Sequence, residues 1–172
     1  MQYVNRVLNF PVISRIRRNH ALEHATLHVL AEKDARVSAA GYSNMQGFII
    51  MGNVSTDLLH SAVNEAVDRL SAGETKLAIH PHCGTNFVAS GLISGVLAWL
   101  AMLGTGSGFG KKLERLPSVL LLATIGMMIS QPLGPRLQEI LTVDPDIGEL
   151  EVTEIARLER QGTPLHRIRT IN

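Results

Sequence analysis

Three residues in the N-terminal part of the chain, His20, Glu23 and His24, have the types and spacing of a catalytic metal site. On an α-helix, positions four residues apart lie one turn apart on the same face, so both imidazoles can reach one metal ion. Glu23 borders that face, where a carboxylate can serve as general base for a metal-bound water. The pattern therefore predicts metal ligands at His20 and His24 and a catalytic role for Glu23.

A second group of potential ligands follows some sixty residues later, in the segment His80-Pro81-His82-Cys83. Zinc sites use three or four protein ligands, and catalytic sites keep one position open for water. His80, His82 and Cys83 can supply the ligands that the first group lacks. We expect zinc as the cofactor, although these donors also suit other transition metals. The sequence leaves open whether the site is catalytic or structural.

The remaining histidines fit this site less well. His28 lies about 12 Å from His20 along a helix, at 1.5 Å per residue, so it cannot join a site centred on His20. A His24–His28 pair is nevertheless a geometric alternative, because these residues are also one turn apart. His60 lies off the apolar stripe of its predicted helix, and His166 lies in a polar C-terminal hairpin, so both are expected at the surface.

Residues 1–85 are predicted to form a small α+β domain that positions both groups of ligands. Asn19 can cap a helix that runs to about Lys33. Two strands of a hairpin, a second helix with a regular apolar stripe, and a third short strand should follow, at residues 36–42, 47–54, 56–72 and 75–79. On an extended backbone, His80 and His82 would point to the same side.

Two long stretches without charged residues follow this domain. No Lys, Arg, Asp or Glu occurs between Lys76 and Lys111, or between Arg115 and Arg136. The apolar cores of these stretches are long enough to cross a hydrocarbon layer of about 30 Å. We therefore predict a transmembrane helical hairpin at residues 86–135, in contact with membrane lipid. Two buried helices of a soluble domain are the alternative.

The first predicted span contains Gly91 and Gly95 in a G-x-x-x-G pattern, which allows helix backbones to approach closely in lipid. Its partner could be the second span, through Ala123 and Gly126, or a second copy of the chain in a homo-oligomer or membrane complex. Incidental glycines in an apolar helix are an equal alternative. The prolines at 132 and 135 should end the second span.

Residues 136–172 are predicted to form an extramembrane tail with a polar β-hairpin, although residues 154–160 could instead form a short helix.

The net charge of +1 gives no electrostatic reason to expect nucleic acid as a partner. A single cysteine excludes an internal disulfide. Neither span contains a histidine, so a haem ligated within the membrane has no axial ligand.

Two resemblances rest on these residues. The run from Asn19 to Thr26, with the segment from His80 to Asn86 before two spans, resembles an uncharacterised family of small two-span bacterial integral membrane proteins, found mainly in cyanobacteria and green non-sulfur bacteria. That resemblance implies a bacterial cytoplasmic or thylakoid-type membrane and no particular activity.

The H-x-x-E-H spelling of His20, Glu23 and His24 is similar to that of inverted-motif zinc peptidases. This likeness implies two zinc ligands and a glutamate base. Their third ligand, a more distant glutamate, has no counterpart here, because the comparable position lies in the first span.

Two signals in the sequence predict opposite orientations in the membrane. The basic residues between the spans favour placing that turn in the cytoplasm, whereas a large N-terminal domain with its own arginines resists export. We expect the two larger extramembrane parts to be cytoplasmic. The sequence thus predicts an integral membrane metal-binding protein, with zinc-dependent hydrolysis of peptides as the activity. A non-enzymatic subunit or assembly factor of a membrane complex, with a structural His/Cys cluster, is the alternative.

Overall fold

The computed structural model of the chain describes residues 6–160 and 163–171. Its contacts divide the chain into two compact units. One unit combines Met1–His80 with Glu139–Asn172 and is called the α+β unit below. The other, Pro81–Gln138, is called the hairpin unit. The mixed helix and sheet class, the two apolar helices and the C-terminal strand hairpin are all as the sequence predicts.

The α+β unit contains a four-stranded antiparallel sheet with the strand order β1-β2-β4-β3. The first hairpin joins β1 (Ala39–Asn44) to β2 (Gly47–Gly52), and the second joins β3 (Glu151–Arg160) to β4 (Thr163–Ile171). Residues 161 and 162, expected in the second turn, lie outside the described residues. Pairing of β2 with β4 connects the two ends of the chain in a single sheet.

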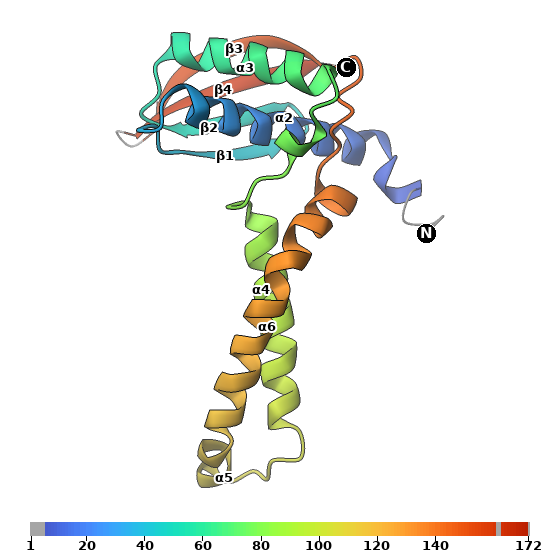
Figure 1. Ribbon diagram of the computed structural model, residues 1–172, viewed down its shortest axis with the longest axis vertical. Helices are drawn as coiled ribbons and strands as arrows, with labels where there is room; N and C mark the ends of the chain where they lie inside the picture. The colour runs from blue at the N-terminus through green and yellow to red at the C-terminus, as the bar shows by residue number, and fades with distance from the viewer. Residues whose placement is uncertain (1–5, 161–162, 172) are drawn as a thin grey trace. The chain divides into compact units, whose positions relative to one another are not determined.

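Two helices, α2 (Pro11–Lys33) and α3 (Thr56–Ser71), lie side by side on one face of this sheet, as Figure 1 shows. The strands alternate, so Phe48 and Ile50 of β2 are buried while Met51 is exposed. The apolar stripe of α3 packs into the same core, as predicted. The fully buried apolar residues at this interface include Leu22, Val29, Leu59, Val63 and Ile168.

Helix α2 begins earlier than the sequence indicates. The expected cap, Asn19, is fully buried in the middle of the helix. Its side chain donates a hydrogen bond to the backbone oxygen of Asn44 and accepts one from the Thr170 hydroxyl. The helix starts instead at Pro11, a residue whose fixed φ angle suits the first helical turn. Asn19 therefore joins the helix to both hairpins of the sheet.

The segment before His80 is also different from the prediction. Thr75–Ala78 forms a short 3-10 helix, η1, in place of a third strand. Leu77 and Ala78 are buried in the core. Residues Pro81 and His82 form a turn, so the extended backbone that would align His80 with His82 is absent from this described segment. The backbone oxygens of Ala78, the last residue of η1, and of Ile79 accept hydrogen bonds from α2, as described below.

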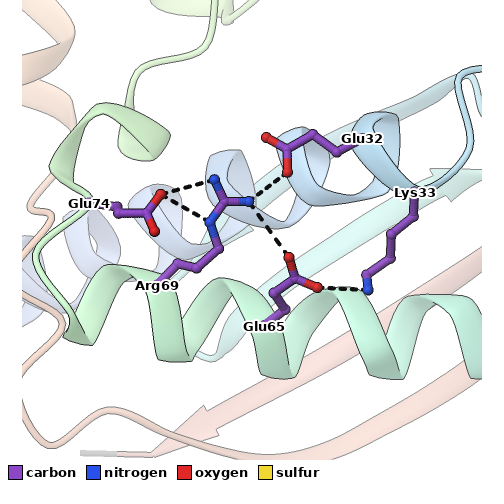
Figure 2. Close-up of polar contacts among 5 residues, drawn as sticks. All are labelled: Glu32, Lys33, Glu65, Arg69 and Glu74. Atoms are coloured by element: carbon purple, nitrogen blue, oxygen red, sulfur yellow. Dashed lines mark hydrogen bonds and ion pairs between the residues drawn. The ribbon is translucent and has the colours of Figure 1, made fainter.

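Ion pairs connect the C-terminal end of α2 with α3 (Figure 2). Arg69 of α3 contacts Glu32 of α2, Glu65 of its own helix and Glu74 beyond the helix end. Lys33 contacts Glu65 at 2.6 Å. The hydrogen bonds to Glu74 and Glu32 raise the pKa of Arg69, and the hydrogen bond from Lys33 lowers the pKa of Glu65. These contacts fix the second half of α2, which carries His28, against α3.

The hairpin unit consists of α4 (Gly84–Met102), the short α5 (Phe109–Glu114) and α6 (Leu116–Leu137). Helices α4 and α6 are long and apolar enough to cross a membrane. Ser90 and Ser130 form a hydrogen bond between them. A Cβ atom on Gly126 would lie 2.7 Å from the Ser94 Cα atom, so the two helices pack closely at this glycine, against Ser94 and not against the expected Gly91 and Gly95.

Helix α6 does not end at its prolines. It runs through Pro132 and Pro135 to Leu137 and continues as a π-helical turn. Each proline removes one backbone donor, but polar side chains and neighbouring helices can satisfy the released oxygens of an apolar helix. Within the described residues, Cβ atoms built on Gly91 and Gly95 would meet no atom within 4 Å. The face that these two glycines form is therefore outside the α4–α6 contact.

Candidate metal centre

Four histidine rings form a row inside the α+β unit. Three come from successive turns of α2, His20, His24 and His28, and the fourth, His80, follows η1. Ring centroids are 4.3 Å apart for His20 and His24, 5.5 Å for His24 and His80, and 5.0 Å for His80 and His28. The tertiary structure thus places His80 beside two of the α2 histidines.

The α2 histidines each donate a hydrogen bond to a backbone carbonyl oxygen, and this decides their tautomers. His20 Nδ1 is 2.9 Å from the Thr142 oxygen, His24 Nδ1 is 2.7 Å from the Ala78 oxygen, and His28 Nε2 is 2.9 Å from the Ile79 oxygen. A carbonyl oxygen can only accept, so each of these nitrogens carries the hydrogen.

In the neutral ring, the lone pair therefore lies on Nε2 of His20 and His24 and on Nδ1 of His28. Metal-binding histidines are held in this way, with the second ring nitrogen bonded to a carbonyl or carboxylate. The bond fixes the ring orientation and makes the other nitrogen a better ligand. All three histidines of α2 are accordingly oriented as metal ligands are.

The spacing of the rings also suits metal binding. An imidazole centroid lies about 3.2 Å from a zinc ion bound at about 2.1 Å, so two rings on one tetrahedral ion have centroids about 5 Å apart. The His24–His80 and His28–His80 separations are close to this value. Ligand nitrogens of His20 and His24 lie within 4.8 Å of one another, so small side-chain rotations would let them share an ion.

Glu23 is packed against the sheet. Its side chain is only 4% exposed, and a Cβ atom on Gly41 of β1 would overlap its carboxylate. Gly41 therefore leaves the space that the carboxylate occupies. His24, next in sequence, is only 2% exposed. Burying such polar groups is unfavourable unless their contacts are satisfied, so this part of α2 is built for a specific polar environment.

Two predicted ligands belong to the hairpin unit. His82 lies in the turn after His80, and Cys83 is the N-cap residue of α4. The Cys83 thiol donates a hydrogen bond to the Thr85 hydroxyl over 3.5 Å. A shared metal centre of these two residues with His20 and His24 stays a prediction.

The sequence did not show that the His28 ring lies beside His80, or which backbone oxygens orient the histidines. A usable signal for His28 was present, because it follows His24 by one helical turn. No sequence signal marks the oxygens of Ala78, Ile79 and Thr142, because every residue has a backbone oxygen.

His60 and His166, which lie outside the two groups of predicted ligands, differ in their exposure to solvent. His60 is exposed on α3, as expected. The expectation for His166 is wrong, because this side chain is fully buried on β4 and its Nε2 is hydrogen-bonded to the Thr56 hydroxyl at 3.0 Å. Its position faces inward because side chains alternate along β4. Burial lowers the pKa of His166, as do the charges of Arg157 and His60.

Residues 15–155 match the family model described as "Domain of unknown function (DUF6391)". The chain belongs to this family. It is also 35% identical, over 169 residues, to an uncharacterized protein of the cyanobacterium Picosynechococcus sp.; the match covers 90% of this chain and 78% of that protein. The predicted relation to an uncharacterised family with a cyanobacterial member is thus confirmed. No solved structure matches the chain.

Proposed function

We propose that this DUF6391 protein is an integral membrane protein whose α+β unit binds a transition-metal ion, zinc in the first instance, through His20 and His24. The observation that carries the proposal is the hydrogen bond from each ring to a backbone oxygen, which leaves a lone pair on the Nε2 atom. Cys83 and His82 are the further ligands that the sequence predicts for this ion.

The place of the site in the chain supports action at a membrane surface. The chain leaves the α+β unit after His80, only four residues before α4 begins. It re-enters the unit at Glu139, close to Thr142, whose oxygen accepts the His20 hydrogen bond. With α4 and α6 as the spans, the metal lies near the lipid boundary of a bacterial membrane, and the α+β unit lies in the cytoplasm.

The reaction that these groups would carry is hydrolysis, with peptides as the first substrate class. A bound zinc ion lowers the pKa of its water, and a buried carboxylate beside the ligands can accept the proton as the water attacks a carbonyl carbon. Glu23 is the carboxylate that fits this role, because it precedes His24 directly and is held in a defined slot beside Gly41.

A second candidate function is favoured by the same hydrogen bonds. His24 and His28 bind successive backbone oxygens at the end of η1, so they hold this segment on α2 without a metal. In that case the protein would be a non-enzymatic subunit or assembly factor of a membrane complex, with the histidines serving the fold.

Metal analysis of the protein, purified in detergent from membranes, distinguishes the two. The proposal expects about one equivalent or more of zinc, iron, nickel or copper per chain, and a value below about half an equivalent would end it. His24→Asn should lose the metal while the fold remains, because the asparagine amide can still donate to the Ala78 oxygen. His60→Gln, at an exposed position of α3, is the matched control and should retain the metal.

Glu23→Gln tests the reaction separately. With p-nitrophenyl acetate and a quenched-fluorescent peptide mixture as probes, this change should retain the metal and lower the hydrolysis rate by about 10²–10⁴-fold. Loss of the metal or of the fold on the same change would favour the structural function.

A further inference from the structure

The four-histidine row is too long for one metal ion. His20 and His28 are eight residues apart on α2, so their Cα atoms lie about 12 Å apart along the helix axis. Two imidazoles that bind one zinc ion have centroids only about 5 Å apart. His20 and His24 have the shortest separation, 4.3 Å, so we assign them to one end, and His28 and His80, 5.0 Å apart, to the other.

We propose that His28 and His80 form a second transition-metal position, beside the ion held by His20 and His24. This inference rests on the proposed function and extends it to a second metal position on the same helix. The centroids of His28 and His80 are 5.0 Å apart, which matches two rings on one tetrahedral ion. The Ile79 oxygen fixes the lone pair of His28 on Nδ1.

The backbone that orients His28 also positions His80. Ile79 accepts the His28 hydrogen bond and is directly followed by His80 in the chain. The preceding residue, Ala78, is fully buried, and its oxygen accepts the bond from His24. One short segment, residues 78–80, thus contacts the rings of His24 and His28 and contributes the ring of His80. Its contacts set the geometry of both positions together.

The two positions have different ligand sets. The sequence predicts Cys83 and His82 as further ligands of the first, whereas the second has two histidines and would complete its coordination with water. A metal ion with open positions can polarise a carbonyl oxygen as a Lewis acid, so the second ion would supply a place for the carbonyl oxygen of a substrate. With only two protein ligands, the second ion should bind to the protein more weakly than the first.

Titration of the metal-free, detergent-purified protein with zinc, and with cobalt as a spectroscopic probe, tests this proposal. We expect the wild-type protein to bind about two equivalents in two steps. His28→Gln should abolish the weaker step and leave about one equivalent, because the glutamine amide retains the hydrogen bond to the Ile79 oxygen but is a poor ligand. The control His60→Gln should bind as the wild type does.

The outcomes separate the two proposals. If His28→Gln binds metal with wild-type stoichiometry, the second position is wrong and the His20–His24 centre stands. If His28→Gln loses both ions with an unchanged circular dichroism spectrum, the histidines form one cooperative centre and the two-position proposal fails. If the wild-type protein binds less than about half an equivalent, both proposals fail.

Discussion

Single residues of α2 show how the fold determines the chemistry of a side chain. His20 and His24 use Nδ1 toward a carbonyl oxygen, whereas His28 uses Nε2. Rings of the same residue type on one helix therefore present different nitrogens for metal binding. This difference follows from the direction of the backbone oxygens that each ring meets.

A single substitution at Gly41 of β1 tests whether this glycine positions the Glu23 side chain. A methyl group at this position would overlap the Glu23 carboxylate, so Gly41→Ala must displace that side chain. We expect the free energy of unfolding to fall by about 1–3 kcal/mol, the usual effect of overpacking a buried site. Chemical denaturation of the purified protein measures it. The hydrolysis rate should fall as well, because Glu23 loses its position.

The control is a double-mutant cycle. In a Glu23→Ala background the space is empty, so Gly41→Ala should cost much less than in the wild type. An equal cost in both backgrounds would show that the strand, and not the contact with Glu23, requires glycine at position 41.

At the scale of elements, α4 and α6 form their contact through small and hydroxyl-bearing residues. Ser90 bonds to Ser130, and Gly126 lies against Ser94. Asn86 accepts a hydrogen bond from Gln138 at the end of the pair. Close approach and side-chain hydrogen bonds of this kind hold helices together where both are surrounded by lipid.

Two glycines of this unit form a matched pair of substitutions. Gly126→Ala places a methyl group 2.7 Å from the Ser94 Cα atom and should destabilise the helix pair by about 1–3 kcal/mol. Gly91→Ala meets nothing within 4 Å among the described residues and should leave the pair intact. Both changes raise helix propensity equally, so their difference isolates the contact. Unfolding by SDS from mild detergent is the measurement.

The same pair of variants addresses the expected homo-oligomer. If a second copy binds on the Gly91–Gly95 face, Gly91→Ala should lower the fraction of dimer seen by crosslinking in membranes, whereas Gly126→Ala should not. Equal destabilisation of the helix pair by both variants would contradict the packing described for α4 and α6.

At the scale of the whole molecule, the α+β unit is assembled from both ends of the chain, with the hairpin unit inserted between them. His166 of β4 reaches Thr56, the first residue of α3, across 110 positions of sequence. Arg15 of α2 donates a hydrogen bond to the Thr170 oxygen of β4. The C-terminal strands therefore complete the unit that holds the histidine row.

His166 makes the stability of this unit pH-dependent. Burial, followed by the charges of Arg157 and His60, lowers the pKa of His166 below its ordinary value of 6.5. The unfolded chain then binds a proton at a higher pH than the folded chain does. The free energy of unfolding should be highest above pH 6.5 and should fall as the pH decreases below 6.5.

The measurement is chemical denaturation across this pH range for wild-type protein and for His166→Gln, both without metal. The two proteins differ only at this side chain, so the difference between the two profiles isolates His166. We expect the profile of the variant to be flatter below pH 6.5. Parallel profiles would contradict the assignment of this effect to His166.

The sequence by itself determined the local elements. Alternation and turn residues predicted both hairpins, a regular apolar stripe predicted α3, and the absence of charges predicted α4 and α6. These patterns act over a few residues, because one turn of helix or two positions of strand decide which side chains share a face. His20 and His24 were predicted as a ligand pair for the same reason.

Only the tertiary structure decided which distant groups meet. It paired β2 with β4, buried His166, and placed His80 between His24 and His28. It also turned residues 75–78 into a 3-10 helix, which brings two carbonyl oxygens to the α2 histidines. Such contacts depend on the path of the chain over 50 or more residues. A backbone oxygen is chemically the same at every position, so no local pattern could identify the ones that orient these rings.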